Sequence, residues 1–203
     1  FINAILRSPS MPPNDPWLSG YAISYYYFGY VMVSMLIRVT GAAPEIGFNL
    51  SLALWYAMAA GGAYSLVYNL IHARKTPLFS NRPGLRLAAP ILGAVMVLLV
   101  SNMGGVLEKL HASGLFWEKT SDGAVVSNFW KWLDIREWDQ APPEPYTALW
   151  DWSTPQRSGI LFWRSSRVIQ DRDYANGERE IIDEFPFFSY LLGDLHPHVL
   201  SMP

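Results

Sequence analysis

Two long runs without a formal charge constrain the fold of this chain more than any other feature. Ile46 to Ile71 covers 26 residues and Leu87 to Leu107 covers 21. A helix needs about 20 apolar residues to cross the hydrocarbon core of a bilayer. Both runs are therefore predicted to be transmembrane helices, and the chain is predicted to be an all-α integral membrane protein.

The charged residues are unevenly distributed, and their placement predicts an orientation in the membrane. The connection 72–86 contains no acidic residue and carries four basic ones: Arg74, Lys75, Arg82 and Arg86. Basic connections face the cytoplasm by the positive-inside rule. Residues 1–45 and 108–184 are then both expected on the extracytoplasmic face of the cell membrane. A net charge of -2 gives no basic surface for nucleic acid.

The pattern divides the chain into four segments. They are an external loop with an interfacial helix (1–45), two membrane helices joined by the basic connection (46–107), a large external loop (108–184) and the start of a further membrane-associated helix (185–203). The interfacial helix is placed at 22–39 because its aromatic start is typical of a membrane surface. The loop is expected to be irregular, since it holds 14 of the 17 acidic residues and lacks clean periodicity. Because the chain starts at Phe1 without Met, we expect it to be an internal fragment of a larger protein.

Asp15 is the first candidate catalytic residue. Pro16 follows it and disfavours helical geometry at Asp15, so an extended or turn conformation would present the carboxylate. An accessible carboxylate can act as a general base or a metal ligand. The alternative is a structural role, in which the carboxylate caps a helix or an Asx turn.

The tyrosines that follow Asp15 are candidate substrate-binding residues: Tyr25, Tyr26, Tyr27 and Tyr30. Flat rings with polar tips can stack on a sugar or line a lipid headgroup pocket. The alternative is a simple aromatic belt at the membrane interface. In a helix, Tyr26 and Tyr30 would share one face.

Asp194, His196 and His198 form the candidate metal site. Side chains alternate along an extended chain, so all three would point to one side, and a helix would still bring Asp194 and His198 together. A carboxylate beside imidazoles suits a divalent metal ion, a proton relay or a phosphate-binding pair. The alternative places Asp194 at the N-cap of the next helix with Pro197 in its first turn.

Two further groups complete the candidate site. Glu184 precedes an apolar Phe-Pro-Phe-Phe stretch, and its alternative role is an ordinary surface acid. Trp163, Arg164 and Arg167 combine an aromatic ring with two cations, a set that can bind a phosphate or pyrophosphate. Ion pairs with the acids of the loop are the alternative for the two arginines.

Several motifs in a fixed order resemble those of the YYY-domain family of multi-spanning membrane proteins (domain of unknown function 2298). The motifs are Asn14-Asp15-Pro16-Trp17-Leu18-Ser19-Gly20, Tyr25-Tyr26-Tyr27-Phe28-Gly29, the segment 162–169, Glu184-Phe185-Pro186-Phe187-Phe188 and Asp194-Leu195-His196-Pro197-His198. The family in turn is remotely similar to the GT-C superfamily of membrane glycosyltransferases. This resemblance implies a fragment of a GT-C-like multi-helix transmembrane bundle.

The resemblance also implies a function, namely transfer of a sugar from a polyprenyl-phosphate donor on the extracytoplasmic face. Asp15 would then be the base, Glu184 and Asp194 would complete the catalytic site, and a divalent metal ion such as Mg²⁺ or Mn²⁺ would assist. Membrane lipid and the lipid-linked sugar are the expected partners. Two alternatives stay open: a transporter that relays protons or ions, and a noncatalytic membrane scaffold.

Overall fold

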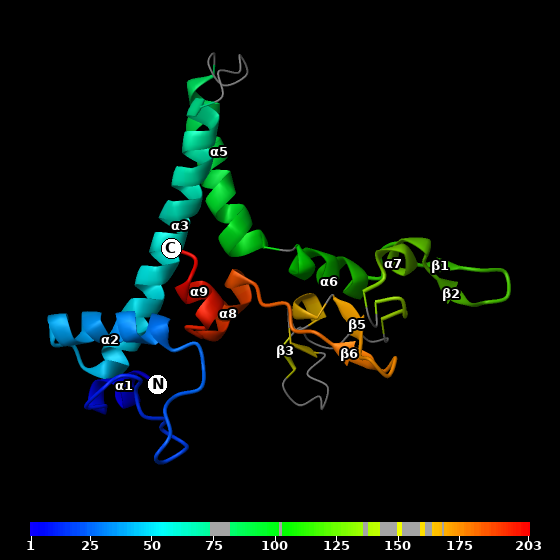
Figure 1. Cartoon of the computed structure of the whole chain (residues 1–203). Coiled ribbons are helices and arrows are strands. Elements are labelled where there is room, and N and C mark those ends of the chain that lie inside the picture. Colours follow the sequence, from blue (N-terminus) through cyan, green and yellow to red (C-terminus); the bar gives the residue numbers. More distant parts are fainter. Residues whose placement is uncertain are drawn as a thin grey trace. The chain divides into compact units, whose positions relative to one another are not determined.

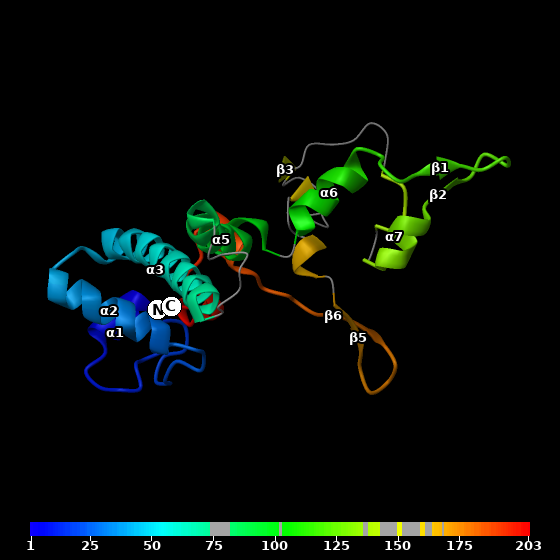
Figure 2. The same cartoon turned by 90° about the horizontal axis from the view of Figure 1, so that it is seen from above.

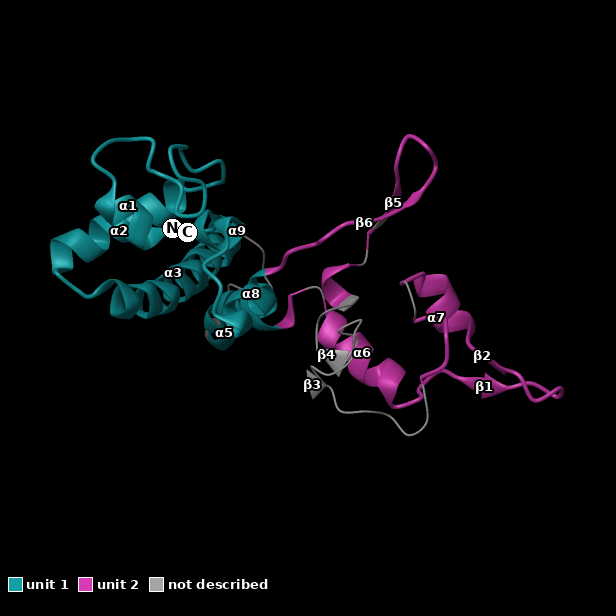
Figure 3. Cartoon of the chain, turned by 90° about the horizontal axis from the view of Figure 1, so that it is seen from below, with its two compact units in different colours: residues 1–99, 186–203 teal, residues 100–185 magenta. Residues whose placement is uncertain are grey.

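The computed structural model describes residues 1–73, 82–101, 103–135, 138–142, 150–151, 159–160, 164–167 and 169–203 (Figure 1). These residues form two compact units (Figure 3). Unit 1 consists of Phe1–Leu99 and Pro186–Pro203, and unit 2 consists of Val100–Phe185. The predicted large loop 108–184 lies within unit 2. Trp163 lies outside the described residues.

Unit 1 is helical, and it joins the first half of the chain to its last residues. Its helices are α1 (Ile2–Arg7), α2 (Phe28–Thr40), α3 (Pro44–Ala73), α5 (Pro83–Val95), α8 (Pro186–Leu192) and α9 (Pro197–Leu200). Helices α1, α2 and α9 all contact α3, as Figure 1 shows.

Helix α3 is the element that can cross a bilayer. Its 30 residues correspond to a length of about 45 Å, more than the roughly 30 Å of hydrocarbon. Its buried residues recur at every fourth position from near its start to its middle: Gly47, Ser51, Trp55 and Ala59. A single buried stripe leaves most of the apolar surface of α3 uncovered within this unit, as suits a helix in contact with lipid or with other membrane helices.

The second predicted span, Leu87–Leu107, is divided in the structure. Helix α5 continues into a π-helical segment, Met96–Val100, and there the helical backbone stops. Ser101 and Met103 have positive φ angles of 54° and 60°, which a right-handed helix cannot accommodate. Among the described helices, α3 is therefore the one long and apolar enough to span a membrane without interruption.

Helix α5 packs along α3, and the two ribbons lie side by side in Figures 1 and 2. Gly93 makes this close approach possible, because a Cβ atom at this position would lie 2.6 Å from a methyl carbon of Val67. Small residues at such a contact allow two backbones to approach each other.

Helix α2 begins later than the sequence suggested. It starts at Phe28, so Tyr25 and Tyr26 precede the helix, and the expected pairing of Tyr26 with Tyr30 on one helical face does not occur. The helix has 13 residues, too few to cross a bilayer, and it ends where Gly41 adopts a left-handed φ of 67°.

The core of unit 1 joins both ends of the chain. It consists of Ile2, Val33, Ile37, Trp55, Leu195 and Leu200. The indole Nε1–H of Trp55 donates a hydrogen bond of 3.0 Å to the carbonyl oxygen of Leu200, a link across 145 residues. Segments that are distant in sequence thus meet in one small apolar cluster.

The described residues of unit 2 form two short α-helices and three two-stranded antiparallel ladders. The elements are α6 (Gly104–Ala112), β1 (Glu118–Lys119), β2 (Val125–Val126), α7 (Asn128–Leu133), β3 (Trp150–Asp151), β4 (Gly159–Ile160), a 3₁₀ turn (Arg164–Ser166), β5 (Gln170–Arg172) and β6 (Glu178–Glu180). The ladders pair β1 with β2, β3 with β4, and β5 with β6. Segment 108–184, which the sequence predicted to be an irregular loop, thus contains these short regular elements among its described residues.

Aromatic side chains form the core of unit 2. Trp130, Ile135 and Trp138 are buried together. His111 lies against both indole rings, and its Nε2 is 2.8 Å from the carbonyl oxygen of Gln140. Burial lowers the pKa of His111 below its usual 6.5, against the opposing effect of two backbone hydrogen bonds.

Candidate functional site

A chain of polar contacts in unit 1 connects two histidines with two hydroxyl groups. The hydroxyl of Tyr25 is 3.1 Å from Nε2 of His196. Nδ1 of His196 is 3.3 Å from Nδ1 of His198, and Nε2 of His198 is 3.3 Å from the hydroxyl of Ser189. The four residues thus form one continuous hydrogen-bonded chain, which can hold a cation or move a proton.

The local sequence explains why the two imidazoles face each other. Gly193, with φ of 68°, ends α8 and turns the chain back. His196 is then the N-cap of α9, with Pro197 in the first helical position. Leu195 and Val199 are fully buried and anchor this segment on both sides of the histidines.

An aromatic cluster lies next to this polar chain. The ring of Phe1 stacks on Tyr25 with centroids 5.6 Å apart, and it also contacts Trp17 and Tyr30 at 5.3 Å each. Tyr25 therefore belongs to both groups, since its ring stacks in the cluster while its hydroxyl reaches His196. Trp17 remains 76% exposed, so its ring face can receive a ligand.

Asp15 has a structural task and also lines a pocket. Its Oδ1 accepts hydrogen bonds from the backbone N–H groups of Trp17 and Leu18, at 2.8 and 2.9 Å. This is the Asx turn that the sequence offered as an alternative role. The half-buried side chain of Asp15 also lines a pocket of about 290 Å³, and Arg7 lines the same pocket.

The structure places the remaining predicted residues as follows. Tyr26 is 78% exposed and stacks edge-on against Tyr25, and Tyr27 is the N-cap of α2. Asp194 is exposed, and its backbone N–H closes the end of α8 on the carbonyl of Ser189. His196, rather than Asp194, thus caps α9.

Three of the other predicted residues, Arg164, Arg167 and Glu184, belong to unit 2. Glu184 is exposed near the end of that unit. Arg167 contacts the hydroxyl of Ser166, which is buried with Ser165 beside it. For Arg164, the described backbone forms part of the 3₁₀ turn.

Three residues lie at the candidate site although the sequence did not predict them there. Arg7 shares the pocket of Asp15, and Ser189 contacts His198. Glu45 lines a second pocket of about 360 Å³ together with Phe1 and Tyr30. For Glu45 a signal existed, because it is one of three acids outside 108–184. Arg7 and Ser189 carried none.

The comparisons with known proteins give one family. The model of the family described as uncharacterized membrane protein (DUF2298) matches residues 1–203. The chain belongs to this family. The match confirms the family resemblance seen in the sequence, and with it the chain is a membrane protein that is mostly helical in its described part. Neither the curated proteins nor the solved structures contain a match.

Proposed function

We propose that this chain belongs to a membrane enzyme that transfers a glycosyl group from a polyprenyl-phosphate donor at the extracytoplasmic face. The observation that carries the proposal is the pocket in which Asp15 and Arg7 lie together. A carboxylate and a guanidinium in one pocket supply the two charges that such a displacement needs, a base for the acceptor and a countercharge for the leaving phosphate.

In the proposed step, the acceptor oxygen attacks the anomeric carbon of the donor sugar. The new carbon–oxygen bond forms as the bond from that carbon to the phosphate oxygen breaks. The phosphate leaves with the electron pair, and the acceptor proton moves to the carboxylate of Asp15. Arg7 would stabilise the negative charge on the leaving phosphate, a role for which the sequence suggested a divalent metal ion or Arg164 and Arg167.

The aromatic cluster supports sugar as the substrate class. Sugars stack on exposed aromatic rings through their apolar faces, and Trp17 and Tyr25 offer such rings. The exposed surface of helix α3 is mostly apolar. This property favours a lipid-linked donor, because the helix can lie in the membrane beside the lipid. The site residues gather around the first half of α3, which is the outer half in the orientation expected from the basic connection.

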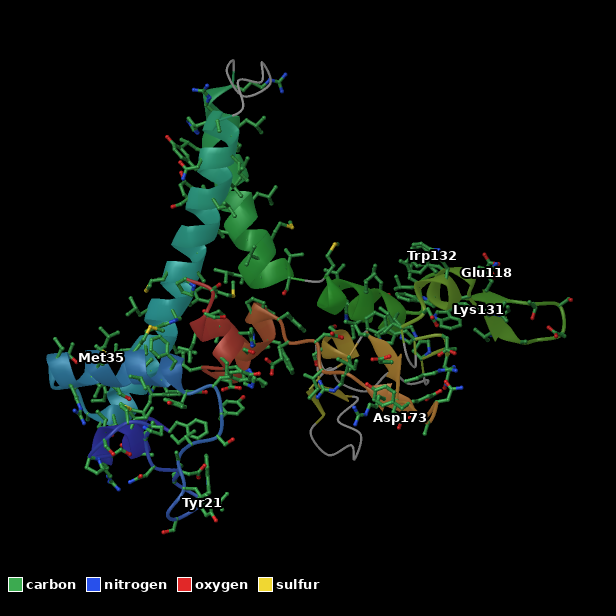
Figure 4. All side chains as sticks on the ribbon, viewed as in Figure 1. Tyr21, Met35, Glu118, Lys131, Trp132 and Asp173 are labelled. Carbon is green, nitrogen blue, oxygen red and sulfur yellow. The ribbon has the colours of Figure 1, made fainter. Side chains whose placement is uncertain are left out.

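The test compares two aspartates whose Oδ1 atoms each accept two backbone hydrogen bonds in a turn. Asp15→Asn keeps the Oδ1 acceptor of the Asx turn and removes the charge. Asp173→Asn is the matched control, because Oδ1 of Asp173 likewise accepts from two backbone N–H groups, those of Ala175 and Gly177, in the turn between β5 and β6 (Figure 4).

The assay measures transfer of radiolabelled sugar from a panel of polyprenyl-phosphate donors by the full-length protein in liposomes. We expect transfer to fall by about 10²- to 10⁴-fold in Asp15→Asn and to be unchanged in Asp173→Asn, which is the usual range for loss of a general base. Transfer at the wild-type rate by Asp15→Asn would exclude Asp15 as the base.

Proton relay is the second candidate function, and the hydrogen-bonded chain from Tyr25 to Ser189 favours it. A relay predicts that liposomes containing the protein dissipate a pH gradient faster than empty liposomes, and that His198→Ala removes the difference. No donor turnover together with such a proton flux would select transport over glycosyl transfer.

A further inference from the structure

We propose that His196 and His198 bind a tetrahedrally coordinated transition-metal ion such as Zn²⁺ through their Nδ1 atoms. The site stands apart from the proposed glycosyl transfer, since it rests on the geometry of the two rings. It keeps the two histidines of the metal site expected from the sequence, leaves out Asp194, and binds Zn²⁺ in place of Mg²⁺ or Mn²⁺. Imidazole nitrogen suits Zn²⁺, whereas Mg²⁺ prefers carboxylate, carbonyl and water oxygens.

The separation of the two Nδ1 atoms fits a tetrahedral ion. Zinc–nitrogen bonds are about 2.0–2.1 Å long. At the tetrahedral angle of about 109°, two such bonds place their nitrogens about 3.3–3.4 Å apart, whereas an octahedral right angle places them about 2.8–3.0 Å apart. Nδ1 of His196 and Nδ1 of His198 are 3.3 Å apart. The pair therefore matches one edge of a tetrahedral site.

The outer nitrogens of both rings also have suitable partners. Ligating histidines usually donate the N–H of their second nitrogen to a fixed acceptor, and this contact sets the tautomer and the orientation of the ring. Here Nε2 of His196 faces the hydroxyl of Tyr25, and Nε2 of His198 faces the hydroxyl of Ser189. With protons on both Nε2 atoms, both Nδ1 lone pairs point into the space between the rings.

A cation between the rings would stabilise this pair of tautomers. Two imidazole lone pairs at 3.3 Å repel each other, and a metal ion between them converts the repulsion into two bonds. The rings are also held in place before any ion arrives, because buried Leu195 and Val199 flank them and Pro197 fixes the backbone between them. Two positions of the tetrahedron remain for water or other ligands.

The experiment uses the full-length protein in detergent micelles after treatment with a chelator, titrated with Co²⁺ as the probe. Tetrahedral Co²⁺ gives visible absorption bands that octahedral aqueous Co²⁺ gives only weakly. We expect one saturable site with these bands, displaced by Zn²⁺. His196→Ala and His198→Ala should lose the bands. His72→Ala is the matched control, since it removes a histidine of the same chain outside the pair, and it should titrate like wild type.

Two milder variants test the outer contacts without removing a ligand. Tyr25→Phe keeps the ring that stacks on Phe1, and Ser189→Ala removes one hydroxyl. Each should weaken Co²⁺ binding by about 10- to 100-fold, the usual effect of losing the partner of a ligating histidine. The proposal is overturned if wild type shows no tetrahedral bands, or if the bands persist in His196→Ala and His198→Ala. Should these two fail to fold, unchanged affinity in both Tyr25→Phe and Ser189→Ala overturns it instead.

Discussion

The substitution Gly29→Ala tests how closely α9 packs on α2. A Cβ atom at position 29 would lie 2.7 Å from both Cβ and Cδ1 of Leu200. Carbon atoms in contact are normally about 3.5–4.0 Å apart, so Leu200 would have to move by about 1 Å. Leu200 is only 5% exposed and packs in the core of unit 1, which leaves it little room.

The expected magnitude follows from two opposing effects. Overpacking a well-packed core costs about 1–3 kcal/mol. Alanine gains back up to about 1 kcal/mol over glycine in a helix, and less in the first turn. We therefore expect Gly29→Ala to reduce the free energy of unfolding by about 1–2 kcal/mol, or the midpoint temperature by roughly 2–8 °C for a domain of this size.

The assay is thermal unfolding in detergent, followed by circular dichroism. Gly84→Ala is the matched control, because Gly84 is also the second residue of a 13-residue helix and no described atom lies within 4 Å of its Cβ position. Its midpoint should equal or exceed that of wild type. The double variant Gly29→Ala, Leu200→Ala should lose less free energy of unfolding than the two single variants lose together, by at least about 1 kcal/mol. A midpoint for Gly29→Ala no lower than that of Gly84→Ala, or strict additivity, would refute the packing argument.

Three further predictions concern the cores of the two units. Trp55→Phe leaves the buried carbonyl of Leu200 without its donor, so we expect a loss of about 1–3 kcal/mol in chemical unfolding, and an unchanged midpoint would contradict this. Ser127→Ala removes the side-chain acceptor of the backbone N–H of Trp130 at the N-cap of α7 and should cost about 0.5–2 kcal/mol, seen as earlier unfolding by tryptophan fluorescence. His111 has a lowered pKa, so the unfolded state binds its proton first. Unit 2 should therefore be most stable above pH 6.5 and lose stability as the pH falls from there towards the folded pKa, and His111→Phe should flatten this pH dependence of unfolding.

The membrane character and the helical fold could be predicted from sequence because each depends on local composition. The charge-free run Ile46–Ile71 lies entirely within α3, whose bounds are Pro44–Ala73. The interruption after Val100 could not be predicted from hydropathy, because Ser101 and Met103 carry no charge and their positive φ angles depend on the structure around them. Hydropathy indicates where a chain can enter a membrane and does not determine where its helices break.

In the candidate site, too, some contacts could be predicted from the sequence and others could not. His196 and His198 are two residues apart, so their convergence is a short-range property that spacing can indicate. The contact of Tyr25 with His196 spans 171 residues, and that of Ser189 depends on how α8 turns into α9. The pocket of Asp15 depends on α1, which supplies Arg7. Long-range packing decides these contacts, and spacing along the chain carries no information about it.

The Tyr25-Tyr26-Tyr27-Phe28-Gly29 motif has a physical explanation in its contacts with the segment His196–Leu200. The first residue of the motif reaches the first residue of that segment, through the hydroxyl of Tyr25 and Nε2 of His196. The last residue of the motif meets the last residue of the segment, where Gly29 lies against Leu200. Two five-residue stretches are thus joined at both ends, so the motif needs a long side chain with a hydroxyl at its start and no side chain at its end. Any change that pushes Leu200 away from Gly29 should therefore also disturb the histidine pair, because α9 carries both His198 and Leu200.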